Sequence, residues 1–338
     1  MPASHEAEFR RKKMNWSTKT VLLTGGTGSF GQKFTEIMLD RCKPKVIRIF
    51  SRDELKQWEM ERAFHGNRRL RYFIGDIRDE KRLERAMDGV DIVVHAAALK
   101  HVPLCEYNPF EAIKTNILGA QNVVDAAINH NVDKVMAIST DKSVNPVNLY
   151  GSTKMCMEKL FIAANSYVGG DRQTRLACVR YGNVIGSRGS VIPLFAAQKK
   201  TGVVTVTDKR MTRFWLTLEQ GVEFVIRCIE VMKGGETFVP KIPSMKVIDL
   251  AKAIAPDCRV TYSGIRPGEK IHETLLTQDE SRHALEFGEF FVVEPEHPWW
   301  NVENWKGGKT LPEGFTYSSD ANTSWLSGVD LKKMMKII

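Results

Sequence analysis

Short β-rich apolar runs alternate with amphipathic helical stretches from residue 20 to about residue 182, and this alternation most limits how the chain can fold. The expected strands are residues 20–24, 46–50, 71–74, 92–95, 134–139 and 176–181. The expected helices are residues 31–41, 52–64, 80–86, 115–129 and 150–166. Strands that alternate with helices form a parallel sheet covered by helices on both faces. The sequence therefore predicts a doubly wound α/β fold.

The rhythm changes after residue 182 to longer irregular segments, with loop-like interruptions at residues 186–189 and 241–243. We expect a smaller C-terminal region that packs on the carboxyl edge of the sheet. The predicted divisions are a flexible N-terminal extension (1–18), the sheet domain (19–182, with a returning segment at about 211–240) and the smaller region (183–210 and 241–338).

Composition excludes several classes of protein. Of the 338 residues, 43% are hydrophobic and 26% are charged, which is typical of a globular protein. No apolar run approaches the roughly 18 residues that a membrane span needs, so no membrane partner is expected. The six cysteines show no CxxC pair and no metal-ligand spacing, and the N-terminus shows no secretory signal. These features predict a cytoplasmic protein without a metal site.

The chain is basic, with 49 Lys and Arg against 40 Asp and Glu and a formal net charge of +9. This excess suits a polyanionic partner. The charge is dispersed, however, and the only dense basic cluster is residues 10–13. No nucleic-acid-binding motif is present. A nucleotide-sized partner is the simpler interpretation, and no nucleic acid is expected.

A glycine-rich turn, GGTGSFG, follows the first predicted strand and precedes a helix. Gly25 permits the tight turn, Gly28 lets the backbone approach a pyrophosphate, and Gly31 lets the helix pack close to the strand. The helix N-terminus then offers N–H groups to phosphates. The spacing is GxxGxxG rather than GxGxxG, and its position in a βαβ unit favours a dinucleotide site.

The end of the second predicted strand indicates which dinucleotide binds. Ser51 and Arg52 stand where an acid that reads the ribose would stand in an NAD site. A guanidinium matches a 2′-phosphate bidentately, which favours NADP over NAD. The alternative is that Arg52 is a surface residue at a helix start. Asp76 follows the third strand and could accept from the adenine amine or cap a helix.

The sequence STDK ends the fifth predicted strand, and Tyr150 and Lys154 then lie four residues apart at the start of the next helix. Residues at this spacing share a helix face. An ammonium beside a phenol lowers the phenol pKa from about 10. Such a tyrosine can remove a hydroxyl proton while hydride leaves the same carbon for nicotinamide.

Seven motifs in combination identify a family: TGGTGSFG, SRDELK, HAAALKHVP, STDKSVNPVNLYGSTK, RYGNVIGSRGSV, KIPSMK and IRPGEKIHE. Together they resemble the extended short-chain dehydrogenase/reductases and, more closely, the inverting UDP-N-acetylglucosamine 4,6-dehydratases that start pseudaminic acid synthesis. The resemblance runs from about Lys19 to Leu331, apart from some of residues 295–313. It implies a Rossmann-type NADP-binding domain and a smaller substrate-binding region.

The resemblance also implies roles for individual residues. Those expected to contact NADP are Gly25, Thr27, Gly28, Ser29, Phe30, Gly31, Ser51, Arg52, Asp53, Glu54, Leu55, Lys56, Asp76, Ile77, Ala96, Tyr150, Lys154, Val184, Ile185, Gly186, Ser187 and Arg188. Those expected to contact the nucleotide sugar are Lys100, Ile138, Ser139, Asn183, Val191, Thr207, Arg266 and Glu269. For the RPGEK segment, a turn and a helix start are the structural alternative.

The two residues after Thr140 indicate the reaction type. Epimerases of the superfamily carry small hydroxyl residues there, and retaining dehydratases carry Asp-Glu, whereas this chain carries Asp141-Lys142. A 4-keto group acidifies the carbon-5 proton, so Lys142 can remove that proton while Asp141 protonates the departing 6-hydroxyl. We expect the catalytic residues to be Thr140, Asp141, Lys142, Tyr150 and Lys154. A neutral Lys142 would require a pKa lowered by burial and by the Lys154 charge.

The resemblance therefore implies an NADP-dependent lyase that converts UDP-N-acetylglucosamine to UDP-2-acetamido-2,6-dideoxy-β-L-arabino-hex-4-ulose, for flagellin or surface glycans. The enzyme alternatives are a retaining UDP-sugar 4,6-dehydratase and a UDP-sugar 4-epimerase. An NADP-sensing or scaffolding member without catalysis would be expected to lack the Tyr-Lys pair or the acid-base dipeptide, and both are intact. A nucleic-acid binder would rest on net charge alone. The family also implies a homo-oligomer, with a hexamer as one form.

Overall fold

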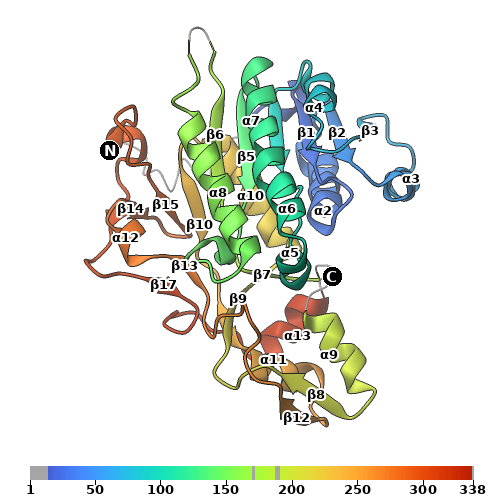
Figure 1. The fold of residues 1–338 in the computed structure, drawn as a ribbon, viewed down its shortest axis with the longest axis vertical. Helices are drawn as coiled ribbons and strands as arrows, with labels where there is room; N and C mark the ends of the chain where they lie inside the picture. Colours follow the sequence, from blue (N-terminus) through green and yellow to red (C-terminus); the bar gives the residue numbers. More distant parts are fainter. Residues whose placement is uncertain (1–13, 170–171, 187–190, 337–338) are drawn as a thin grey trace.

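A ten-stranded sheet forms the centre of the computed structural model, which describes residues 14–169, 172–186 and 191–336 (Figure 1). In the described chain the strand order is β16-β14-β15-β10-β6-β5-β4-β1-β2-β3. The parallel part consists of β1 (Thr20–Thr24), β2 (Val46–Ser51), β3 (Leu70–Ile74), β4 (Ile92–His95), β5 (Lys134–Ile138), β6 (Arg175–Val179) and β10 (Thr237–Pro240). The prediction of a doubly wound α/β fold is confirmed, and all six expected strands are present.

Helices cover both faces of this sheet because the strands bury apolar side chains on both sides. On one face, Leu23 of β1 packs in the cluster that includes Phe34 of α2 and Val225 of α10. On the other face, Leu22 packs in the cluster that includes Phe161 of α8. The first face holds α2 (Ser29–Ile37), α3 (Glu54–Ala63) and α10 (Leu218–Val231), and the second holds α4 (Glu80–Met87), α7 (Gly119–Asn129) and α8 (Leu149–Ala164).

A smaller lobe lies beneath the sheet, at the end where α8 begins (Figure 1). Its own apolar core includes Phe195, Trp215 and Leu250. Its elements are β7 (Asn183–Ile185), α9 (Val191–Lys199), β8 (Val203–Val206), β9 (Thr212–Thr217), β11 (Ser244–Lys246), α11 (Val247–Ile254), β12 (Arg259–Tyr262) and α13 (Gly328–Lys336). The remaining elements connect or border the two lobes: η1 (Trp16–Thr18), η2 (Met38–Cys42), α5 (Val102–Tyr107), α6 (Pro109–Ile113), η3 (Lys114–Leu118), η4 (Asp141–Ser143), β13 (Thr274–Leu276), α12 (Gln278–Ser281), η5 (Val302–Trp305) and β17 (Tyr317–Ser318).

Two expected divisions of the chain differ from the structure. The segment that we assigned to the smaller region contributes β14 (Ala284–Glu286), β15 (Phe290–Val293) and β16 (Lys309–Thr310), which extend the main sheet antiparallel beyond β10. Phe290 and Val292 of β15 are fully buried, so the strands beyond β10 are part of the packed core.

The prediction that residues 1–18 form a flexible extension is wrong for residues 14–18. Trp16 is only 4% exposed, and its indole Nε1 donates to Glu230 Oε1 at 2.8 Å. Burial of an indole with its N–H satisfied anchors a segment firmly. The packed chain therefore includes residues 14–18, and residues 1–13 lie outside the described part.

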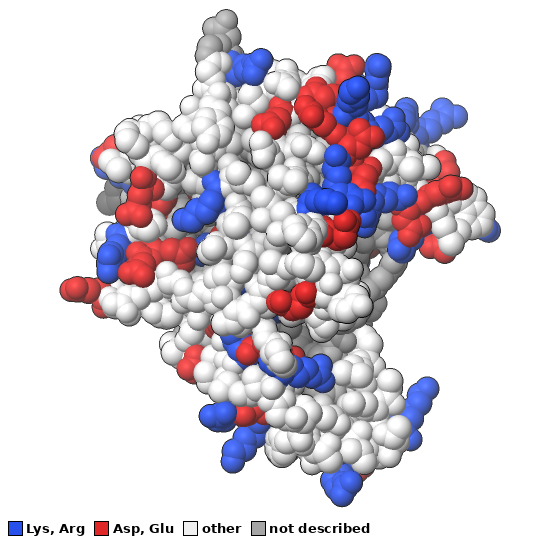
Figure 2. All heavy atoms as spheres, in the orientation of Figure 1, with Lys and Arg blue, Asp and Glu red and all other residues white. Residues whose placement is uncertain are grey.

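On one face of the molecule, the surface charge of the described residues is mixed. Lys and Arg lie among Asp and Glu across the face shown in Figure 2, most densely over the region of α4, and they form no continuous basic surface there. Within the described ranges, no helix is long and apolar enough to cross a membrane.

Candidate active site

The predicted catalytic residues come together at the carboxyl edge of the parallel strands. Asp141 and Lys142 lie in η4, directly after β5, and Tyr150 lies in the first turn of α8. Asn148 caps α8 through the backbone N–H of Gly151 at 2.8 Å. In an open parallel sheet this edge is where ligands bind.

Asp141 and Lys142 form an ion pair at the centre of this site. Lys142 Nζ donates to Asp141 Oδ1 at 3.0 Å, and the Thr140 hydroxyl donates to the same oxygen at 3.0 Å. Asp141 is fully buried, and its Oδ2 has no hydrogen-bond partner in the described chain. An unpaired buried carboxylate oxygen is costly, so it indicates a group meant to meet a ligand.

The lowered pKa that a neutral Lys142 would require is not found in the structure without a ligand. Burial does favour the neutral amine, but the charges of Asp141 and Glu273 outweigh it and raise the Lys142 pKa above its usual value. Glu273 Oε1 lies 3.6 Å from Lys142 Nζ. Without a ligand, Lys142 is therefore an ammonium group held between two carboxylates.

Tyr150 and Lys154 share one face of α8, as expected, but Lys154 does not lower the Tyr150 pKa here. Burial raises the Tyr150 pKa to about 12, against the opposing effects of the Lys142 charge and a hydrogen bond with the Thr140 side chain. Lys154 Nζ is directed instead to Met157 Sδ at 2.9 Å, and burial lowers the Lys154 pKa to about 8. Lys142 is thus the cation that acts on Tyr150.

A buried ionic network fixes the loop that carries Asp141 and Lys142. The hydroxyls of Ser139 and Ser143 both donate to Glu158 Oε1 on α8. Arg180 donates to both oxygens of Glu158 and to Glu280 Oε1 at 2.7 Å. Glu158 was not singled out from the sequence, although it lies four residues after Lys154 and shares its face.

The glycine-rich turn has the geometry of a phosphate cradle. Gly25 has φ of +68°, and a Cβ there would lie 2.8 Å from the backbone N of Ala97. A Cβ on Gly31 would lie 2.3 Å from the carbonyl oxygen of Gly26. Gly28 is the N-cap of α2 and has no side chain to cap the first turn, so a phosphate can approach that turn. The turn therefore fits a dinucleotide.

The residues expected around the adenosine ribose also lie together. Arg52, which is 53% exposed in its side chain, has Nη1 3.6 Å from Asp76 Oδ2, and Asp76 also accepts from Arg78. Ser51 Oγ accepts from Gln57 Nε2 at 3.1 Å. The helix-cap alternative for Asp76 is wrong, because Asp79 caps α4.

Four other expected NADP contacts, Asp53 to Lys56, begin α3. The carboxylate of Asp53 caps this helix, accepting from the Lys56 backbone N–H at 3.0 Å, and it also pairs with the Lys56 ammonium. The remaining expected NADP contacts follow β1, β3 and β4, lie in α2, or lie in and just after β7: Thr27, Ser29, Phe30, Ile77, Ala96, Val184, Ile185 and Gly186. The Ile185 side chain is buried in the core of the smaller lobe, so only its backbone can face a cofactor. Ser187 and Arg188 lie outside the described residues.

The residues expected to meet a nucleotide sugar come from both lobes. Asn183 begins β7, and its Oδ1 is buried without a hydrogen-bond partner in the described chain, as is Glu269 Oε2. Val191 begins α9, Thr207 follows β8, and Arg266 lies exposed in the loop after β12. Ile138 ends β5, and Ser139 follows it. Desolvation and the Lys142 charge lower the Lys100 pKa. The two buried oxygens without hydrogen-bond partners, Asn183 Oδ1 and Glu269 Oε2, are suited to bind a polar ligand between the lobes.

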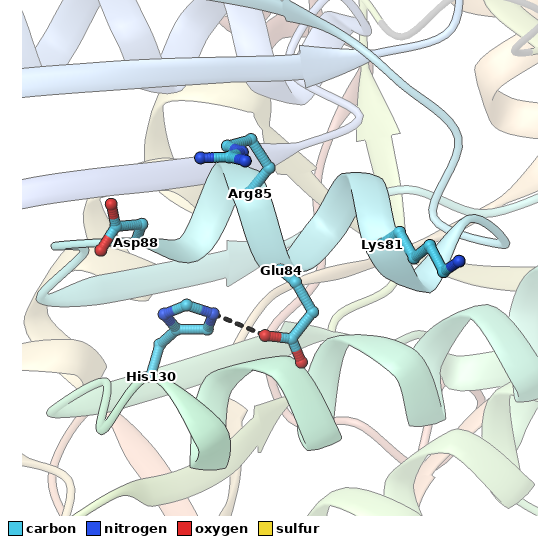
Figure 3. Close-up of a pocket in the computed structure, with 5 residues that line it drawn as sticks. All are labelled: Lys81, Glu84, Arg85, Asp88 and His130. Carbon is cyan, nitrogen blue, oxygen red and sulfur yellow. Dashed lines mark hydrogen bonds and ion pairs between the residues drawn. The ribbon is translucent and has the colours of Figure 1, made fainter.

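A separate surface pocket of about 340 Å³ lies far from this chemistry (Figure 3). It is lined along α4 by Lys81, Glu84 and Arg85, by Asp88 just after that helix, and by His130 at the C-terminal end of α7. In Figure 3 the His130 ring points to Glu84, and its Nε2 lies 2.5 Å from Glu84 Oε2. Helices that follow parallel strands end at the amino edge of the sheet, so this pocket is opposite the candidate active site.

Comparisons with known proteins agree with this geometry. Residues 21–295 match the family described as "Polysaccharide biosynthesis protein". The chain is 50% identical over 332 residues to an inverting UDP-N-acetylglucosamine 4,6-dehydratase of Campylobacter jejuni, covering 96% of this chain and 98% of that protein. It is 45% identical over 283 residues to a UDP-glucose 4-epimerase of Rickettsia canadensis, covering 81% of this chain and 82% of that protein.

Solved structures support the same assignment. The crystal structure of Pen from Bacillus thuringiensis superposes with a TM-score of 0.86 at 40% identity, over 96% of this chain and 100% of that one. The dTDP-glucose 4,6-dehydratase DesIV of Streptomyces venezuelae, solved with NAD and TYD, has a TM-score of 0.66 at 21% identity, over 75% of this chain and 86% of that one, and so supports the fold. The chain belongs to the polysaccharide biosynthesis protein family, with a Rossmann-type fold of the short-chain dehydrogenase/reductase kind.

Proposed function

We propose that this chain is an NADP-dependent, inverting UDP-N-acetylglucosamine 4,6-dehydratase that catalyses the first step of pseudaminic acid biosynthesis. The observation that carries the proposal is the Asp141–Lys142 ion pair, 3.0 Å long, beside Tyr150 at the carboxyl edge of the sheet. An acid next to a base is what elimination across carbons 5 and 6 requires. The identity to the Campylobacter jejuni enzyme supports the same reaction.

The cofactor is expected at the glycine-rich turn, with Arg52 and Ser51 at its 2′-phosphate and Tyr150 and Lys154 at its nicotinamide ribose. A nicotinamide bound there would supply the hydride acceptor for carbon 4 of the sugar and the hydride donor for carbon 6. Tyr150 removes the 4-hydroxyl proton in the first step, for which its raised pKa must fall. A ligand that brings Lys154 nearer to the phenol, together with the Lys142 charge, would lower that pKa.

Lys142 must be a neutral amine to remove the carbon-5 proton, and a single proton transfer produces that form. If the proton of the 3.0 Å bond moves from Lys142 to Asp141, the pair becomes an amine and a carboxylic acid. Exclusion of water by the bound sugar favours this neutral pair over the ion pair. The amine then takes the carbon-5 proton, and Asp141 gives its proton to the 6-hydroxyl, which leaves as water. Reprotonation of carbon 5 on the opposite face inverts it.

The test is incubation of the protein with UDP-N-acetylglucosamine and NADP, followed by NMR of the product. We expect a 6-deoxy-4-keto sugar with inverted configuration at carbon 5. The alternative of a 4-epimerase is favoured by the Rickettsia relatives, and it would give UDP-N-acetylgalactosamine with carbon 6 unchanged. A retaining dehydratase would give the 6-deoxy-4-keto sugar with its original carbon-5 configuration.

Two further proposals concern the cellular location and the oligomeric state of the protein. We expect the enzyme to act in the cytoplasm, where nucleotide sugars are made, and to be a homo-oligomer, with a hexamer as one form. Mass measurement in solution tests the second expectation.

A further inference from the structure

A second buried carboxylate, to which the mechanism above assigns no step, lies against Lys142. Glu273 directly precedes β13, is 2% exposed, and has Oε1 3.6 Å from Lys142 Nζ. Asp141 Oδ1 is 3.0 Å from the same nitrogen. The Lys142 ammonium is therefore held between a carboxylate after β5 and one contributed from far along the chain.

The position of Glu273 is fixed by its backbone. Its N–H donates to Ser319 Oγ at 2.9 Å, and its carbonyl oxygen accepts from the Ser319 N–H at 2.8 Å. Its side chain has weaker contacts, because Oε2 has no hydrogen-bond partner among the described residues, although Lys270 Nζ lies 3.8 Å away. A buried carboxylate with so few hydrogen bonds is costly for folding, which points to a use in the site.

Several charged groups surround this pair and bear on its protonation. Arg213 Nε lies 3.7 Å from Glu273 Oε1. The groups whose charges or dipoles act on Lys142 or Glu273 are Asp141, Arg213, Lys270, Lys100 and Tyr150. The carboxylates of Asp141 and Glu273 lie nearest to the ammonium, so the loss of either negative charge weakens proton binding at Lys142.

We propose that Glu273 is a positioning residue that acts through Lys142: it holds the ammonium beside Asp141 and sets the pH range over which the pair keeps its shared proton. This inference rests on the proposed function. Asp141 and Lys142 are active while they hold one transferable proton between them. Loss of that proton at alkaline pH leaves no acid for the 6-hydroxyl. The negative charge of Glu273 favours proton retention, so it extends activity to higher pH.

The experiment compares kcat and KM as functions of pH for the unmodified protein, Glu273→Gln and Glu273→Asp. Glu273→Gln removes the charge with little change of shape, so its alkaline loss of activity should begin about one pH unit or more lower. Its kcat should fall by about 10²-fold through misplacement of Lys142, while KM changes little because Lys142 acts on the sugar only after binding. Glu273→Asp keeps the charge one methylene further away and should be intermediate in both respects.

The matched control is Glu286→Gln, which breaks an ion pair with Lys241 outside the site and should leave the pH profile and kcat unchanged. The proposal would be overturned if Glu273→Gln had the same alkaline limb of the pH profile and the same kcat as the unmodified protein. If Glu273→Gln does not fold, Glu273→Asp is the deciding variant. An alkaline limb of the pH profile and a kcat in Glu273→Asp equal to those of the unmodified protein would then overturn the proposal. If the unmodified protein does not dehydrate UDP-N-acetylglucosamine, the proposed function fails instead, and that result is separate from any difference between variants.

Discussion

At the residue scale, the proposed mechanism depends on the charge state of Lys142. Two carboxylates within 4 Å keep it protonated, so the resting site holds an ion pair rather than the acid and base that elimination uses. The same closeness makes conversion simple, because one proton moving along the Lys142–Asp141 hydrogen bond produces both. In the proposed mechanism, the site therefore needs no separate group to deprotonate Lys142.

Cofactor choice is a second residue-scale question, and Arg52→Ala tests it. We expect affinity for NADP to fall about ten- to a hundredfold, because a charge-assisted bidentate contact contributes roughly 1.5–3 kcal/mol. Affinity for NAD should change little, since NAD has no 2′-phosphate. Fluorescence titration with each cofactor measures both.

Arg85→Ala is the matched control, because Arg85 is an exposed arginine at the opposite edge of the sheet. It should leave both affinities unchanged. Equal binding of NADP and NAD by the unmodified protein would contradict the assignment of Arg52 to a 2′-phosphate.

At the scale of elements, α8 carries two of the proposed catalytic residues and also anchors the loop that carries the others. Tyr150, Lys154 and Glu158 recur at four-residue spacing on one face, and Glu158 accepts from both serines that flank Asp141 and Lys142. These hydrogen bonds tie the loop to the helix. Arg180 extends this network through Glu280 to α12.

Arg180→Met tests the anchoring network. It leaves the carboxylate of Glu158 buried without its cation, so we expect a loss of about 3–5 kcal/mol in the free energy of unfolding. Adding Glu158→Leu should recover part of that loss, because it removes the buried Glu158 charge and leaves only the partly exposed Glu280 without its arginine. Urea denaturation measures both variants.

The control for this network is Arg227→Met, which removes a half-exposed ion pair with Glu289. We expect a change below about 1 kcal/mol. A cost for Arg180→Met no larger than that of Arg227→Met would show that the buried network does not hold this region.

Trp16 tests how the N-terminal segment is attached. Trp16→Ala should lower the free energy of unfolding by about 3–5 kcal/mol, because a buried indole and its hydrogen bond to Glu230 are lost. Trp58→Ala, at a half-exposed indole on α3, should cost less than about 1 kcal/mol.

Removal of residues 1–13, with the chain starting at Met14, should leave stability nearly unchanged. A small effect of Trp16→Ala, or a large drop in melting temperature on removing residues 1–13, would show that the anchor lies elsewhere. Thermal unfolding followed by circular dichroism reports on both changes.

On the scale of the whole molecule, the central sheet was predictable because each of its first six strands is a short apolar run between amphipathic helices. The antiparallel strands β14 to β16 were not, since pairing at a sheet edge depends on residues far apart in sequence. The same limit applies to the site. Tyr150, Asp141 and Lys142 stand in recognisable motifs, whereas the influence of Glu273 on Lys142 arises only when the segment before β13 packs against η4.

The central claim is that Lys142 removes the carbon-5 proton, and turnover of UDP-N-acetylglucosamine in deuterated water tests it most directly. The unmodified protein should give a 6-deoxy-4-keto product with deuterium at carbon 5 and inverted configuration there. Lys142→Ala should bind substrate and cofactor almost normally but form this product about 10²–10⁴ times more slowly. Near-normal turnover by Lys142→Ala, or a product that retains the original carbon-5 configuration, would contradict the account.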